Sequence, residues 1–135
     1  MINENIKKWI VKALEDLRIA QHEIAFPDDE ISTSPVCFHC QQVVEKLLKA
    51  YLISKGIEFS KTHDLEHLLH LCERADGKFG NLHVANLTFY AVEARYPDEF
   101  YIPTVDEVRE CLGIALLFKN FVPRKLGMDE KDVNL

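Results

Sequence analysis

The segment Cys37-Phe-His-Cys-Gln-Gln-Val-Val-Glu-Lys-Leu-Leu-Lys-Ala-Tyr51 decides the fold that this sequence predicts. At 100° per residue, its apolar side chains fall in one broad arc of a helix and most of its polar side chains fall in the opposite arc. The apolar arc comprises Val36, Cys37, Cys40, Val43, Val44, Leu47, Leu48 and Tyr51. The opposite side, here called the polar stripe, comprises Gln41, Gln42, Glu45, Lys46 and Lys49. The pattern predicts a long amphipathic helix.

Local signals mark both ends of this helix. Ser34 is a natural N-cap, and Pro35 at the first helical position removes no hydrogen bond that the helix needs. Gly56 favours the left-handed conformation that ends many helices. Because one chain would struggle to cover both the apolar arc and the apolar residues that intrude on the polar side, we expect a homodimer. The intruding residues are Phe38, Leu52 and Ile53.

Four further segments show helical periodicity. Asp64 is placed to cap one of them, and Thr104 and Glu107 form a capping box at the start of another. No alternating run is long enough for a convincing strand. The sequence therefore predicts an all-α, up-and-down bundle of about five helices in residues 1–123, followed by a charged C-terminal tail in residues 124–135. The four further helices are expected at 3–25, 65–75, 82–95 and 104–122.

The bulk composition narrows the classes of function. The 135 residues carry a net charge of −6, and the pI is about 5.5. A negative field repels phosphate, so we expect no passive binding to nucleic acid or to an anionic membrane. No apolar run is long enough to span a bilayer, and the N-terminus lacks the pattern of a secretory signal. Four cysteines without such a signal indicate free thiols in the cytoplasm.

Cysteines and histidines at helical spacing suggest a metal or redox site, but the pattern is incomplete. A tetrahedral site built on Cys37 and Cys40 needs two more ligands, and the sequence has no second paired cysteine motif. Both residues fall in the apolar arc, where cysteine behaves as a small hydrophobic residue. His63, His67 and His70 do not form an HExxH motif. We expect the two cysteines to pack in the core, and we expect no metal and no cofactor.

Several cations could act on a ligand. Lys46 and Lys49 belong to the polar stripe, whereas Lys61 and His63 precede the next helix. Lys49 follows Glu45 by four residues, which allows an ion pair on a solvated helix face. The other interpretation is that these cations contact a phosphate or a protein partner.

Arg95 and Tyr96 stand at the end of the apolar segment, just before Pro97. A cation at this position can bond the last carbonyls of the helix, a role that lysine would also fill. A bidentate grip on phosphate requires arginine, and the tyrosine ring offers a face for stacking on a base. The residues alone leave both interpretations open. The candidate site for a nucleotide or partner comprises Arg95, Tyr96, Lys46, Lys49, Lys61 and His63.

Three motifs in this order resemble the HEPN (higher eukaryotes and prokaryotes nucleotide-binding) domain family. They are CFHCQQVVEKLLKAYL at 37–52, KTHDLEHLL at 61–69 and YAVEARYPDEF at 90–100. The resemblance implies a helical bundle similar to the helical, substrate-binding domain of kanamycin nucleotidyltransferase. It also implies that the protein forms dimers, as family members often do. Many members work beside minimal nucleotidyltransferases, some of them as toxin–antitoxin pairs.

Many HEPN proteins are metal-independent ribonucleases in which four to six residues separate an arginine from a histidine. This chain departs from that pattern, because positions 100–102 after Arg95 hold Phe, Tyr and Ile, and no other arginine has a histidine at the required distance. The resemblance therefore implies a non-catalytic member that binds a nucleotide or a minimal nucleotidyltransferase. Two alternatives stay open. One is a noncanonical ribonuclease that uses Arg95 and His63, and the other is a purely structural helical adaptor.

Overall fold

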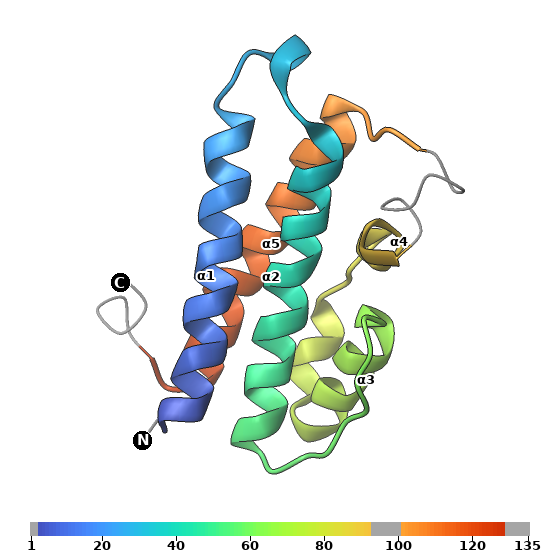
Figure 1. Cartoon of the computed structure of the whole chain (residues 1–135). Coiled ribbons are helices and arrows are strands. Elements are labelled where there is room, and N and C mark those ends of the chain that lie inside the picture. Colours follow the sequence, from blue (N-terminus) through green and yellow to red (C-terminus); the bar gives the residue numbers. More distant parts are fainter. Residues whose placement is uncertain (1–2, 93–100, 129–135) are drawn as a thin grey trace.

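The computed structural model describes residues 3–92 and 101–128 (Figure 1). Two short 3-10 helices, η1 (Asp28–Glu30) and η2 (Gly77–Asn81), lie in the connections. No strand occurs in the part of the chain that the structure describes, which confirms the predicted all-α fold. The α-helices are α1 (Glu4–Ile24), α2 (Thr33–Ser54), α3 (Leu65–Ala75), α4 (Leu87–Val92) and α5 (Val105–Lys125).

Helix α2 is the centre of the bundle. The long helices α1 and α5 run beside it, and the shorter α3 and α4 pack against its remaining flank (Figure 1). It therefore contacts all four of the other α-helices. A helix with neighbours on so many sides needs a wide apolar arc, as the sequence predicts for this segment.

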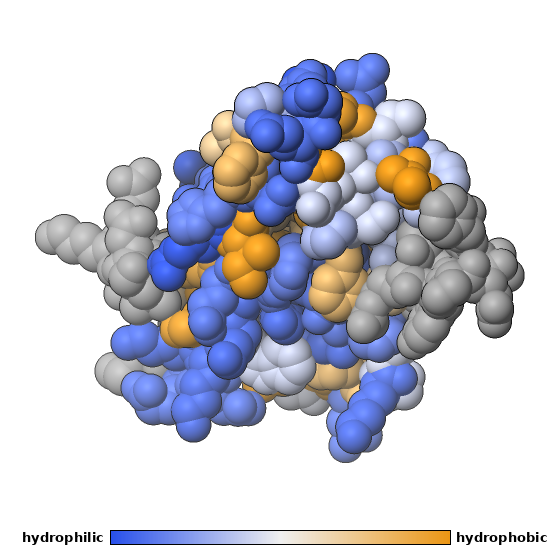
Figure 2. Space-filling model, turned by 45° about the horizontal axis from the view of Figure 1, so that its top comes forward, coloured by the Kyte–Doolittle hydropathy of each residue, from blue (hydrophilic) through white to orange (hydrophobic). Residues whose placement is uncertain are grey.

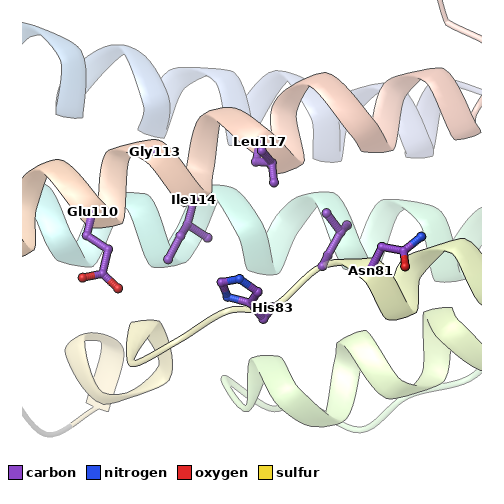
Figure 3. Close-up of a pocket in the computed structure, with 7 residues that line it drawn as sticks. Asn81, His83, Glu110, Gly113, Ile114 and Leu117 are labelled. Atoms are coloured by element: carbon purple, nitrogen blue, oxygen red, sulfur yellow. The ribbon is translucent and has the colours of Figure 1, made fainter.

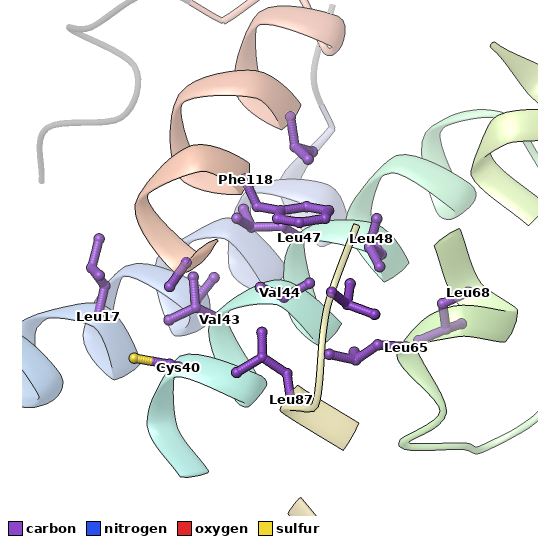
Figure 4. Close-up of a cluster of buried hydrophobic side chains, with 14 of the residues drawn as sticks. Leu17, Cys40, Val43, Val44, Leu47, Leu48, Leu65, Leu68, Leu87 and Phe118 are labelled. Atoms are coloured by element: carbon purple, nitrogen blue, oxygen red, sulfur yellow. The ribbon is translucent and has the colours of Figure 1, made fainter. Parts of the chain in front are cut away.

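Side chains from the surrounding helices meet α2 in one hydrophobic core (Figure 4). Leu47 of α2, Leu65 of α3 and Phe118 of α5 are fully buried there. Complete burial of such a side chain contributes about 1.5–3 kcal/mol. Cys37 and Cys40 are fully buried as well, so their predicted packing in the core is confirmed.

The predicted starts of α1, α3 and α5 are confirmed by their caps, whereas that of α2 is corrected. The side chain of Asn3 caps α1, that of Asp64 caps α3, and Thr104 forms the predicted capping box of α5. Helix α2, however, begins at Thr33 after the N-cap Ser32, and not after Ser34. Pro35 still lies in the first turn, where its missing N–H removes no intrahelical bond, so the sequence pattern allowed either start.

The helix predicted at 82–95 is wrong over its first five residues. Leu82 is extended, Ala85 has a φ of +49°, and α4 begins only at Leu87. Val84 and Leu87 are buried, so the apolar composition reflects burial and not helical structure. A segment that is apolar on every side has no period, and this pattern cannot distinguish a helix from a buried irregular stretch. The last residues of that prediction, 93–95, lie outside the described residues.

Helix α5 ends later than predicted. It continues through Pro123 to Lys125, and the cap residue Leu126 bonds back to the carbonyls of the last turn. Met128 is buried, and its N–H donates to the carbonyl of Pro123. The division of the chain at residue 123 stays a prediction.

The surface is mostly hydrophilic in the view of Figure 2, where apolar side chains form small separate groups. Leu52 is buried and Ile53 is half-buried, so one chain covers much of the apolar surface of α2 that led us to expect a homodimer. The dimer stays a prediction. No helix in the described residues is long and apolar enough to cross a membrane. The large apolar side chains that remain exposed are Ile19, Phe26, Tyr101, Ile102 and Leu117.

Candidate functional site

Much of the polar stripe of α2 is buried. The exposed fractions of Gln41, Glu45 and Lys49 are only 0%, 4% and 7%. Buried polar groups require partners, because a lost hydrogen bond in the interior costs about 1–3 kcal/mol. No side-chain nitrogen or oxygen among the described residues is buried without a hydrogen bond, so the stripe forms a satisfied internal network.

Glu45 is the centre of this network. Its Oε1 accepts hydrogen bonds from Gln41 Nε2 at 3.0 Å and from His63 Nδ1 at 2.7 Å, and its Oε2 accepts from Lys49 Nζ at 3.1 Å. Burial alone would raise the pKa of the carboxyl, but these hydrogen bonds outweigh that effect and hold the pKa below its usual range. Glu45 is therefore an ionised acceptor shared by three donors.

Lys49 is enclosed together with this carboxylate. Its Nζ lies 5.9 Å from the centroid of the Trp9 ring and 5.8 Å from that of Phe59, distances at which a cation is attracted to an aromatic face. The predicted ion pair between Lys49 and Glu45 is thus present, but it is internal and not solvated. In this conformation the ammonium group is already engaged on several sides.

A second carboxylate, Asp16 of α1, joins two further residues of α2. Its Oδ1 lies 2.7 Å from His39 Nδ1, and its Oδ2 accepts from Lys46 Nζ at 2.5 Å. Sequence reasoning missed Asp16 and His39. A signal was present, because Asp16 lies among the apolar positions that α1 turns toward its neighbours, where an acidic residue needs a partner.

His63 is the part of the network that reaches the surface. Its side chain is 55% exposed, while its carbonyl accepts a 3.3 Å hydrogen bond from Gln41 Nε2. Since an ionised Glu45 can only accept, Nδ1 carries the proton and Nε2 is left for another contact. Lys61 is also exposed, and within residues 3–92 and 101–128 it makes no ion pair or hydrogen bond.

Arg95 and Tyr96 of the predicted site lie outside the described residues. The beginning of α4, the helix that precedes them, is fixed near His63. Thr88 Oγ1 accepts from the backbone N–H of Leu65 at 3.1 Å and donates to Glu66 Oε2 at 2.9 Å. These bonds tie α4 to the first turn of α3, directly after the loop that carries Lys61 and His63.

The remaining metal and redox candidates are packed or dispersed. A hydrogen bond to Cys111 and burial raise the pKa of Cys37, and burial raises that of Cys40, so both remain thiols. His67 and His70 are exposed on α3. Across residues 3–92 and 101–128, no three His, Cys, Asp or Glu side chains are grouped so that they could hold a metal ion.

The family model of the HEPN domain matches residues 6–126, and the chain belongs to this family. Solved structures with the same fold include TT1696 from Thermus thermophilus, which is 24% identical with a TM-score of 0.68. That match covers 91% of this chain and 99% of the other. ST0689, described as an archaeal HEPN homologue, is 25% identical with a TM-score of 0.63, and the match covers 90% and 97% of the two chains. No curated protein matches the sequence.

Proposed function

We propose that this protein is a non-catalytic HEPN domain that binds the phosphate of a nucleotide at the surface formed by Lys61 and His63. The 2.7 Å bond between His63 Nδ1 and Glu45 Oε1 supports the proposal most directly. It fixes the orientation of an exposed imidazole from a buried carboxylate, so little entropy is lost when Nε2 of the doubly protonated ring donates to a phosphate oxygen. Lys61, which is exposed and makes no ion pair within residues 3–92 and 101–128, adds positive charge two residues away.

The other candidate residues take different parts in this proposal. Lys49 and Lys46 hold Glu45 and Asp16 in place, and so act on the ligand indirectly. Arg95 and Tyr96 retain the parts proposed from sequence, a bidentate phosphate contact and a stacking face. The nucleotide is bound either alone or together with a minimal nucleotidyltransferase partner, as in toxin–antitoxin modules.

A noncanonical ribonuclease is the second candidate, and the same carboxylate–histidine pair favours it. A histidine oriented by a carboxylate can serve as a general base or acid. The arginine motif of catalytic members is absent, so we expect no cleavage of single-stranded RNA without added metal. Cleavage that survives repurification and is lost in both His63→Ala and Arg95→Ala would establish the second candidate instead.

Isothermal titration calorimetry with ATP, GTP, their diphosphates and inorganic phosphate tests the first proposal. We expect at least one nucleotide to bind, and we expect His63→Ala to weaken its binding about 10- to 100-fold, as the loss of a charge-assisted contact implies. His67→Ala is the matched control, because His67 is also an exposed histidine and lies four residues further on. The proposal fails if no nucleotide binds the parent protein or if both variants bind like it.

A further inference from the structure

A groove runs between α5 and the irregular segment before α4, on residues that the proposed nucleotide site does not use (Figure 3). Its main cavity has a volume of about 250 Å³. Next to it lies a smaller cavity of about 40 Å³, which Ala85 lines. Glu110 and Ile114 line both cavities. The two form one depression, here called the α5 groove. Its lining includes Leu82, His83, Glu110, Gly113, Ile114 and Leu117.

Gly113 lies in the middle of the 21-residue helix α5, where glycine is unfavourable. None of the described residues requires it, since a Cβ added at this position would meet none of their atoms within 4 Å. The missing side chain leaves the backbone of α5 open to close approach from outside. Small residues such as glycine let two helix backbones approach closely, as they do between helices in membranes.

Ala85, on the opposite wall, shows the reverse mismatch, because it adopts a backbone conformation that favours glycine. Its φ of +49° is rare for a residue with a Cβ and costs of order 1–2 kcal/mol. A glycine where a side chain would fit and an alanine where glycine would fit thus line the same groove. Such violations of local preference concentrate at functional sites.

Charge and hydrophobicity indicate what fits there. Leu117 is 55% exposed and Ile114 is half-buried, so the floor is apolar. Glu110 is exposed at one end, and no cation of the described chain pairs with it. A second copy crossing at Gly113 would place Glu110 opposite another Glu110 if parallel, or opposite Leu116 if antiparallel. Neither arrangement places a cation directly opposite Glu110.

We propose that the α5 groove is a docking site for an amphipathic helix of a partner protein. The helix would insert a leucine-sized side chain between Leu82 and Leu117, cross α5 over Gly113, and pair a lysine or arginine one turn away with Glu110. The proposal does not rest on nucleotide binding, because it uses no residue of the loop that carries Lys61 and His63.

Two designed peptides test the docking site by fluorescence anisotropy. Both are fluorescein-labelled, alanine-based helices longer than about 15 residues, the length at which isolated helices become stable. One carries a stripe of leucines with arginine one turn away, and the other has glutamate in place of arginine. We expect saturable binding of the arginine peptide with a Kd of the order of 100 μM or tighter, and at least 5-fold weaker binding of the glutamate peptide.

Variants then locate the binding. Gly113→Gln should raise the melting temperature, because glutamine is the better helix former. It should nevertheless weaken binding of the arginine peptide at least 10-fold, because the new side chain blocks the approach to α5. Glu110→Lys should reverse the preference between the peptides. Glu58→Gln changes an exposed glutamate elsewhere that pairs with none of the described residues, and it should change nothing. The proposal is overturned if the arginine peptide does not bind, if both peptides bind alike, or if Gly113→Gln binds like wild type. Dissociation of a homodimer by Gly113→Gln would assign the groove to a second copy and overturn it too.

Discussion

Glu45 is a carboxylate that the fold keeps ionised with almost no access to solvent. Removing it would leave the ammonium group of Lys49 buried without a counter-charge, and losses of this kind cost about 3–5 kcal/mol. We therefore expect Glu45→Ala to lower the free energy of unfolding by about 3 kcal/mol in urea denaturation.

Two further variants control for this result. Glu15→Ala removes an exposed partner of Lys12 and should change stability by less than about 0.5 kcal/mol. The double variant Glu45→Ala, Lys49→Met should be more stable than Glu45→Ala, because it removes the stranded charge. If Glu45→Ala alone were as stable as wild type, the Glu45–Lys49 pair would not be buried in solution.

Glu107 provides a prediction for acid pH. Hydrogen bonds from the hydroxyls of Tyr101 and Tyr90 hold its pKa at about 2, below the usual 4.5. A lowered pKa means that the folded state favours the ionised form. The resulting stability is complete above pH 4.5 and is lost as the pH falls toward 2. We expect Glu107→Gln to flatten the dependence of melting temperature on pH in this window, whereas Glu58→Gln should keep the wild-type slope.

At this scale, the sequence reveals pairs within one helix better than pairs between helices. The Glu45–Lys49 ion pair follows from a spacing of four and was predicted. That it is buried depends on Trp9 and Phe59, which come from two other segments. The contact between His63 and Glu45 joins residues 18 apart, and no local pattern indicates such a contact.

Helix termini offer a test at the scale of the element. Thr104 bonds the backbone N–H of Glu107 and completes a capping box, so Thr104→Ala should cost about 1 kcal/mol. Ser34, which the sequence suggested as the cap of α2, lies inside the helix, and Ser34→Ala should be close to neutral. Urea denaturation of both variants separates the cases. If Ser34→Ala lost more stability than Thr104→Ala, Ser34 would be the N-cap of α2 after all.

Elements with a clear period and a cap were predictable within one or two residues, as α1 and α3 show. The segment at 82–86 was not, because its apolar side chains carry no period. Its path depends on burying Val84 and Leu87 while the backbone turns at Ala85, which are constraints that only the packed bundle imposes.

For the whole molecule, we expect a homodimer, with a mass twice the 15.6 kDa of the chain in sedimentation at tens of micromolar. Because α2 is covered within one chain, we expect the interface to include Ile19 and Phe26, which are about half exposed near the end of α1. Ile19→Glu should then shift the equilibrium to the monomer, while Leu117→Glu in the α5 groove should not. A wild-type monomer at these concentrations would contradict the prediction.

Trp9 is the only tryptophan of the 135 residues, and it stands beside the ammonium group of Lys49. Indole fluorescence responds to nearby charge, so the emission of this protein reports from one known place. Lys49 is joined through Glu45 to His63, and a ligand that moves His63 would disturb the field at the indole. If a nucleotide binds at His63 as proposed, the emission of Trp9 should change on binding, and a titration can follow this change without a label.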